Sequence, residues 1–255
     1  MYMVKNHFIK DLGVMIGRSM RQVFRSMDTI ITVTVMPIMN MMLFVYVFGG
    51  AIQTGTENYI NYLLPGILLI SVASGISYTA IRLFTDKQKG MFERFQSMPI
   101  SRSSILWGHV LTSMLSNVIS LIIIVLVALI MGFRATAGVI EWLTVAGILG
   151  VFTMALSWVA TIPGLIAKSS DGAGAFAYPI ILLPFISSAF VPTETMPFAV
   201  RTFAENQPVT LVVDALRDLL SGKSASVDLW RVLALCIGIM LVAYIFAMKI
   251  FTKRK

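Results

Sequence analysis

Residues 109–133 read HVLTSMLSNVISLIIIVLVALIMGF, and this stretch decides the fold class. After His109 it contains no acidic or basic side chain. A helix needs about 20 apolar residues to cross the hydrocarbon core of a bilayer. Further stretches that reach or approach this length lie on both sides of it, at 29–48, 59–83, 139–167, 173–191 and 229–248. The sequence therefore predicts an all-α integral membrane protein, with six transmembrane helices in one domain.

The composition agrees with this fold class. Hydrophobic residues make up 57% of the chain and charged residues 13%, whereas a soluble domain carries about 25% charge. A transmembrane barrel is the alternative, but its strands alternate apolar and polar residues, and these stretches are apolar on every side. The single cysteine, Cys236, excludes a disulfide framework. His7 and His109 are too far apart to suggest a metal site, so we expect none.

The basic residues predict the orientation of the chain. Most of the 20 Lys and Arg residues lie before the first stretch, between the second and third, and after the last. The positive-inside rule therefore places both termini in the cytoplasm. The net charge of +8 is explained by this orientation, so we expect no nucleic-acid partner. The apolar residues begin too late for a cleavable signal peptide.

The segment 6–28 has the pattern of an amphipathic helix. Apolar residues share one half of its helical wheel, and Arg18, Arg21 and Arg25 share the other. Such a helix lies in the membrane interface, with its basic face toward lipid phosphates or a partner protein. It either anchors the chain to membrane lipids or also contacts a cytoplasmic partner.

The connection 86–104 reads DKQKGMFERFQSMPISRSS and can form a short cytoplasmic helix. Asp86 is suited to capping its start. Pro99 would end it, and Ser101 can cap the following span. An ordinary solvated charged loop is the alternative.

The connection 192–228 is predicted to fold as short helices against the outer ends of the spans. Residues 209–220 read VTLVVDALRDLL, and Gly222 follows as a helix stop. The helical period places Asp214 and Arg217 toward water.

Two patterns within the spans concern packing. Ser71 and Gly75 are four residues apart, a spacing of small residues that allows helices to approach closely. Pro179 and Pro184 predict a kinked fifth span, which is either a moving part or a static bend.

Several kinds of chemistry are not supported by the sequence. No span carries an ionisable residue near its middle, which argues against a transporter with its own coupling ion, although backbone carbonyls could still bind sodium. No Walker A motif is present, so the chain does not hydrolyse ATP by that route. His109 lies at the edge of a span, which disfavours a serine–histidine hydrolase.

Five ordered motifs carry a family resemblance. They are the basic segment leading to Pro37, YINYLLPG at 59–66, ERFQSMPISR at 93–102, FVP at 190–192 followed by Met196-Pro197, and NQPVTLVVDALRDLLSG at 206–222. In this order and spacing the chain resembles the membrane subunits of ABC-2 type exporters, especially their daunorubicin-resistance branch.

The resemblance implies a particular assembly, in the plasma membrane of a bacterium or archaeon. Two permease chains, identical or homologous, would pair with two copies of a separate ABC ATP-binding subunit. ATP and Mg²⁺ would bind to that partner, so this chain would be no enzyme and would hold no cofactor itself.

The resemblance also implies two functional regions. The connection between the second and third spans would be a coupling helix that contacts the ATPase through Glu93, Arg94, Met98, Pro99, Ile100, Ser101 and Arg102. An outer gate with re-entrant helices would include Phe190, Val191, Pro192, Asn206, Pro208, Thr210, Asp214 and Arg217.

The expected function is therefore the permease subunit of an exporter that moves a hydrophobic drug, a peptide or a lipid-like molecule. An exporter of polysaccharide or lipid-linked glycan is the alternative within the same class. An ATP-independent channel or secondary transporter is the alternative from a different class.

Overall fold

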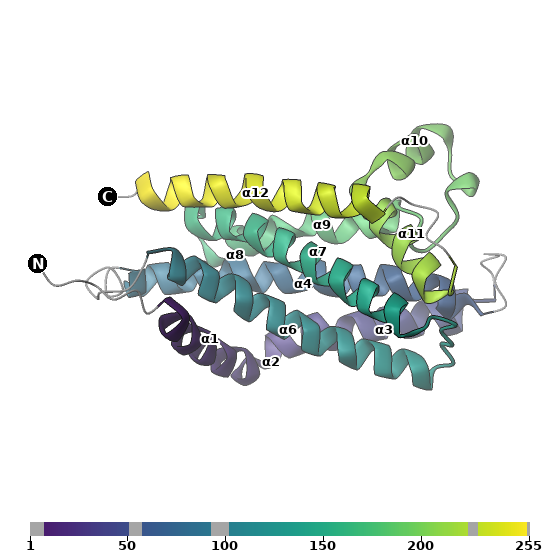
Figure 1. Cartoon of the computed structure of the whole chain (residues 1–255), viewed down its shortest axis with the longest axis horizontal. Helices are drawn as coiled ribbons and strands as arrows, with labels where there is room; N and C mark the ends of the chain where they lie inside the picture. The colour runs from purple at the N-terminus through teal and green to yellow at the C-terminus, as the bar shows by residue number, and fades with distance from the viewer. Residues whose placement is uncertain (1–7, 51–57, 93–101, 224–228, 254–255) are drawn as a thin grey trace, which may run out of the picture.

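The computed structural model describes residues 8–50, 58–92, 102–223 and 229–253. Within these ranges it consists of helices joined by turns and short extended segments (Figure 1). The elements are α1 (Phe8–Arg25), α2 (Met27–Ile30), η1 (Ile31–Val35), α3 (Met36–Leu43), η2 (Phe44–Phe48), α4 (Tyr59–Gln88), α6 (Arg102–Ile130), α7 (Val139–Ile166), α8 (Ser170–Ala175), α9 (Ala177–Leu182), η3 (Leu183–Ile186), η4 (Thr193–Thr195), α10 (Phe198–Asn206), α11 (Pro208–Leu220) and α12 (Leu229–Lys253). The all-helical prediction is confirmed for this part of the chain.

Five helical segments of the described residues are long and apolar enough to cross a membrane. They are the first span from α2 to η2, and the helices α4, α6, α7 and α12. The sixth expected span differs, because α8, α9 and η3 form a shorter, interrupted segment over Ser170–Ile186. The α-helix gives way to a 3₁₀ turn at Leu183–Ile186, where Pro184 donates no backbone hydrogen bond, and the chain becomes extended at Ser187. The predicted kink is confirmed, and six complete spans are not.

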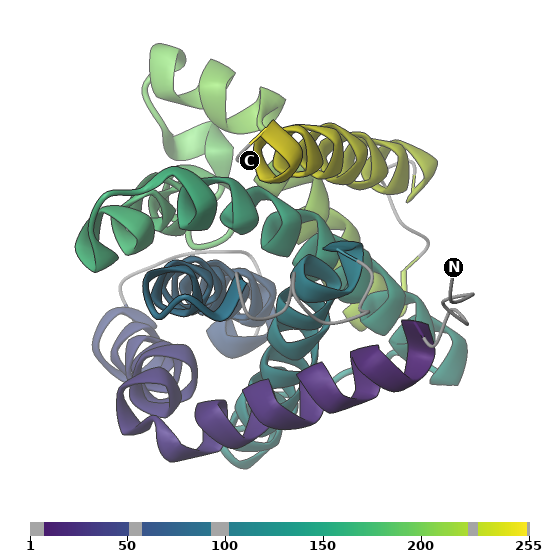
Figure 2. The same ribbon diagram turned by 90° about the vertical axis from the view of Figure 1, so that its left-hand side faces the viewer.

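Helix α4 is the centre of the bundle. It is apolar around its whole circumference and is buried along most of its length, as expected for a helix surrounded by others. It packs against α3, α6, α7 and α8, and the end-on view shows it enclosed by its neighbours (Figure 2). Its 30 residues span about 45 Å, which exceeds the thickness of a bilayer core.

The two ends of the bundle differ in what covers them. Helix α1 lies across the bundle at the end where α12 finishes (Figure 2). Helices α10 and α11 lie at the opposite end, and α10 projects away from the bundle (Figure 1). We call these the α1 end and the α11 end.

The first span contains two π-helical turns, η1 and η2, on either side of α3. The first π turn is attached to two neighbouring helices. The hydroxyl of Ser71 in α4 donates to the carbonyl of Val33 at 2.7 Å, and Thr34 shares a 2.8 Å hydrogen bond with Ser120 of α6. The span is therefore fixed to both α4 and α6 where its helical geometry is irregular.

Helix α11 ends where the sequence predicts. Gly222 follows it with a φ of +64°, in the left-handed region that favours glycine. Its amide donates to Leu219, and the amide of Lys223 donates to Asp218, which together form a Schellman motif.

Candidate functional site

An aromatic cluster occupies the α11 end of the bundle. The rings of Phe185 and Phe190 stack with centroids 4.8 Å apart and planes 3° apart. Phe44, from the π turn η2, lies 4.7 Å from Phe190. Two segments that are distant in the sequence, η2 and residues 185–190, therefore meet in one apolar cluster, and we call Phe44, Phe185 and Phe190 the aromatic closure.

Helix α4 holds the backbone of this closure in place. The hydroxyl of Tyr59 donates to the carbonyl of Phe190 at 3.0 Å. Seven residues further along α4, Gly66 lies directly against Ala189. A Cβ added at Gly66 would be 2.6 Å from the Ala189 methyl. The segment around residue 190 can lie this close to α4 only because position 66 has no side chain.

Arg217 of α11 joins the same region through four contacts. Its guanidinium lies over the ring of Tyr62, 3.8 Å from the centroid, and its Nε donates to the Tyr62 carbonyl at 3.4 Å. Its Nη1 donates to Asp214 at 2.8 Å, and its Nη2 donates to the carbonyl of Ser188 at 2.6 Å. The Ser188 hydroxyl in turn donates to Asp214 at 2.6 Å. The prediction that Arg217 faces water is wrong, because the guanidinium turns inward to these partners.

Gln207 fixes the corner between α10 and α11. Its buried side-chain amide donates to the carbonyls of Ile186 at 2.6 Å and Leu183 at 3.3 Å, the last and first residues of η3. The hydroxyl of Thr210 donates to the carbonyl of Ala204, at 2.5 Å. These bonds tie the interrupted helix to the helices that cover it.

A cluster of small polar residues connects α4, α6 and α7 inside the bundle. The hydroxyl of Ser113 lies 2.7 Å from that of Thr79 and 3.1 Å from that of Ser157, and all three residues are buried. Asn117, one turn along α6, packs its side chain against Gly75, where a Cβ would be only 2.4 Å away. Gly75 is therefore a close-packing position against α6, whereas Ser71 contacts the first span through its hydroxyl.

A charged cluster lies near the α1 end. Asp86, in the last turn of α4, accepts from Arg18 of α1 at 3.2 Å and lies 3.5 Å from Nε2 of His109 in α6. Arg82 is buried one turn away on α4. Asp86 is therefore not the cap of a short following helix, as the sequence suggests. It belongs to α4, and it joins α1 to α4 at a point adjacent to α6.

Helix α1 packs closely on α6. Its own residues Met15 and Val23 are buried. A Cβ added at Gly108 of α6 would lie only 3.0 Å from the Cβ of Met15. Arg21 and Arg25 are exposed on its other side. The described side chains of α1 therefore have the two-faced arrangement that the sequence predicts.

The structure brings some of the predicted site residues together and leaves others apart. Phe190, Asp214 and Arg217 lie at the α11 end, and Thr210 fixes the start of α11. Val191 and Pro192 are half-buried beside them, Asn206 is exposed at the end of α10, and Pro208 begins α11. The predicted coupling residues Glu93, Arg94, Met98, Pro99, Ile100 and Ser101 lie outside the described residues, and Arg102 begins α6.

Tyr59, Tyr62, Ser188 and Gln207 contribute to this site and were not among the predicted site residues. Tyr59, Tyr62 and Gln207 occur in the sequence motifs that carry the family resemblance, so the motifs contained a signal for them. Ser188 lay in no motif. Among the described residues, no group of three or more His, Cys, Asp or Glu could hold a metal ion.

Comparison with known proteins identifies the family. The sequence model of the ABC-2 type transporter family matches residues 10–220. This range includes both the charged cluster and the aromatic closure. The chain belongs to this family. One ABC-2 relative is the daunorubicin resistance ABC transporter permease protein DrrB1 of Streptomyces coeruleorubidus, 30% identical over 227 residues, or 88% of this chain and 80% of the relative.

A second ABC-2 relative comes from Mycobacterium tuberculosis. It bears the name "Probable doxorubicin resistance ABC transporter permease protein DrrC" and is 25% identical over 219 residues, which cover 84% of this chain and 78% of the relative. Together with the apolar helices, this family membership establishes a multi-pass membrane protein of the permease type.

Proposed function

We propose that this chain is the permease subunit of an ATP-driven exporter for a hydrophobic drug, a peptide or a lipid-like molecule. The observation that carries the proposal is the ABC-2 family match over residues 10–220, with relatives named for daunorubicin and doxorubicin resistance. ATP and Mg²⁺ would bind to a separate ATP-binding subunit, because this sequence contains no Walker A motif.

The α1 end is proposed to face the cytoplasm. The arginines of α1 lie at this end, and α12, which finishes there, is followed in the sequence by Arg254 and Lys255. Positive charge is retained on the cytoplasmic side of membrane proteins. The aromatic closure would then lie at the outer side of a plasma membrane, with both chain termini inside.

The segment between α4 and α6 is proposed to contact the ATP-binding subunit. Helix α4 ends at Gln88 and α6 begins at Arg102, so a force applied between them acts on two membrane helices. The Arg18–Asp86 ion pair supports this role, because α1 would follow α4 when that segment moves. In this proposal Glu93 and Arg94 make the polar contacts to the partner, within the stretch 93–102.

The aromatic closure is proposed to be the outer gate. A hydrophobic molecule leaving the bundle at the α11 end would have to separate Phe44 from Phe190. Arg217 and Tyr59 hold the surrounding backbone, so they would set how readily the gate opens. Two permease chains, each with six membrane-embedded helical segments including α8–η3, would complete the transporter.

Purification from the native host tests the assembly. We expect the tagged chain, extracted in mild detergent, to carry an ATP-binding protein in equal amount and to show ATPase activity. The double variant Glu93→Ala with Arg94→Ala should insert and fold normally but lose both. A lone oligomer without ATPase activity would contradict the proposal and favour a channel or secondary transporter.

Transport in inverted membrane vesicles tests the substrate class. ATP-dependent uptake of daunorubicin is expected with the intact complex and should be absent with the double variant. ATP-dependent movement of a lipid-linked glycan without drug uptake would refute the substrate assignment and leave the permease assignment in place.

A further inference from the structure

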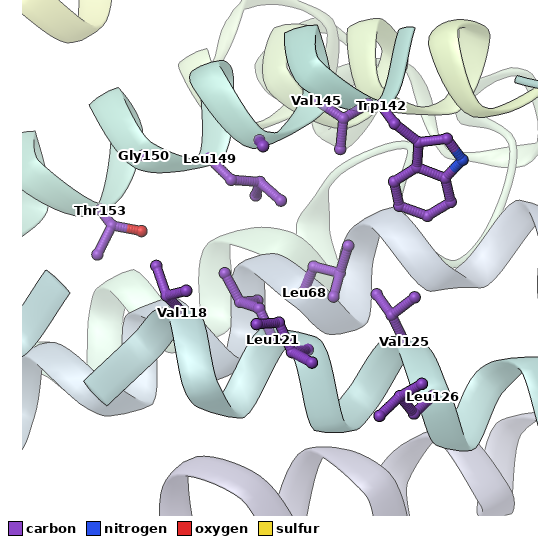
Figure 3. A pocket seen from close by; sticks show the side chains of 12 residues that line it. Leu68, Val118, Leu121, Val125, Leu126, Trp142, Val145, Leu149, Gly150 and Thr153 are labelled. Carbon is purple, nitrogen blue, oxygen red and sulfur yellow. The ribbon is translucent and has the colours of Figure 1, made fainter. Parts of the chain in front are cut away.

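An apolar groove lies between α6 and α7, with α4 as its floor. It encloses about 260 Å³. Figure 3 shows Val118 and Leu126 on one wall, Leu149 and Trp142 on the other, and Leu68 beneath them. The described residues that line the groove include no charged one, so water would gain few hydrogen bonds there.

The groove is open along one side. Ile122 and Leu126 on its rim are 55% and 54% exposed, and both belong to a helix that is long and apolar enough to cross a membrane. Where this helix crosses the membrane, the groove therefore opens toward the acyl chains of the lipids. The groove therefore differs from the flat outer face of α12, because it can enclose a chain on three sides.

A polar hollow of about 440 Å³ lies at the α11 end, beyond the groove. Arg134 and Lys223 line it together with Asn58, Asn61 and Ser221, and among the described residues no carboxylate lines it. The amide of Arg134 donates to Asn61 at 3.1 Å, and its Nη1 donates to the carbonyl of Leu129, in the last turn of α6, and to that of Phe133, beyond its end. The net charge of the lining is positive, which favours an anionic occupant.

The hollow and the groove share the same helix faces. Asn61 in the hollow and Leu68 in the groove are seven residues apart on α4. Phe133 of the hollow follows the end of α6, the helix that forms one wall of the groove. Residues seven apart lie on one side of a helix, about 10 Å along its axis. The hollow therefore continues the groove toward the membrane surface.

From this arrangement we propose that the groove and the hollow bind one anionic glycerophospholipid of the leaflet at the α11 end. One acyl chain lies in the groove between α6 and α7, and the phosphate lies in the hollow beside Arg134 and Lys223. The site is separate from the aromatic closure, and the proposal holds whether or not the chain exports drugs.

Photocrosslinking in lipid vesicles tests the site. The intact protein would be reconstituted in vesicles of unlabelled phosphatidylcholine. Each sample would contain a trace of one probe lipid, either phosphatidylglycerol or phosphatidylcholine, and both probes would carry the same diazirine-labelled acyl chain. Labelled peptides from 118–126 and 142–153 would be compared with peptides from the exposed face of α12. We expect phosphatidylglycerol to label the groove above the α12 background, and more strongly than phosphatidylcholine does.

Two glycines on α7 provide matched variants. Gly150 lines the groove, where a Cβ would make only an ordinary 3.5 Å contact, and Gly147 faces open space outside it. Gly150→Leu should fill the groove and reduce its labelling to the α12 background. Gly147→Leu adds the same side chain to the same helix and should leave the labelling unchanged.

Lys223→Gln tests the headgroup. Lys223 is exposed, so its replacement should leave the fold intact. One cation near a membrane surface contributes about a fivefold preference for anionic lipid, and the preference for phosphatidylglycerol should fall by about that factor. Equal labelling of the groove and α12, equal effects of the two glycine variants, or no headgroup preference would each overturn the proposal. A groove covered by a second protein chain would show no labelling above the α12 background, and that result would also overturn the proposal.

Discussion

Replacing Arg217 with methionine should weaken the attachment of α11 to the bundle. Methionine keeps an unbranched side chain but removes every donor of the guanidinium. The hydrogen bond to the Ser188 carbonyl contributes about 2 kcal/mol, the stacking on Tyr62 about 1 kcal/mol, and the partly exposed pair with Asp214 less than about 1 kcal/mol. The expected loss of folding free energy is therefore about 3 kcal/mol.

The native cysteine provides the assay. Cys236 is the single cysteine of the chain, it is 1% exposed, and it lies on α12, which packs against α11. A fluorogenic thiol reagent would therefore react with it only as the bundle opens during heating. For a chain of this size about 2–4 °C of melting temperature is lost per kcal/mol, so Arg217→Met should lower Tm by about 6–12 °C.

Arg201→Met is the matched control. Arg201 also pairs with a carboxylate, Glu205 at 2.6 Å, but both side chains are more than 40% exposed on α10. Its replacement should leave Tm nearly unchanged. Arg217→Lys should give an intermediate value, because a single ammonium cannot reproduce the planar stack and the fork of donors. Similar shifts for Arg217→Met and Arg201→Met would refute the reasoning.

Three further variants can be measured in the same assay. Gly66→Ala would place a methyl 2.6 Å from a neighbouring side-chain carbon and should destabilise the protein by about 1–3 kcal/mol; an unchanged Tm would show that the closure can move away from α4. Asp86→Asn removes the carboxylate charge between Arg18 and the buried Arg82, and should lower Tm and increase hydrogen exchange in α1; unaltered exchange would contradict the attachment of α1 through this pair. Ser113→Ala removes a hydroxyl shared by two neighbours and should cost about 1 kcal/mol, and no loss of Tm would mean that those neighbours find other partners.

Local signals predicted the elements that depend on local structure. Helix α11 begins at Pro208 and stops before Gly222, because proline fits the first helical turn and glycine fits the left-handed turn after the last one. The long spans were also predictable, since each needs only a sufficient length of apolar residues.

Long-range pairing explains where the sequence interpretation failed. Asp86 looks like a helix cap because it is charged and follows an apolar stretch, but its partner Arg18 is 68 residues away. Arg217 looks solvent-exposed on a helical wheel, although the Tyr62 ring that it covers is 155 residues away. A single sequence contains no signal that joins such residues.

The interrupted segment shows a limit of hydropathy. Residues 173–191 are apolar throughout, so their composition predicts a span. Hydropathy does not register that Pro184 lacks an amide donor or that Ser187 adopts an extended backbone. The carbonyls freed there are taken by the side chain of Gln207, a residue outside the apolar stretch.

The π turns of the first span have a consequence for how chain length varies among relatives. A π turn is what an α-helix becomes when one residue is inserted while the residues on both sides keep their positions. Loss of one residue within η1 would therefore restore an α turn and leave Met41 facing the core. The same loss within α4 would rotate everything beyond it by about 100° and carry Asp86 away from Arg18. One-residue gaps between relatives should accordingly fall in the two π turns of the first span and be absent from α4.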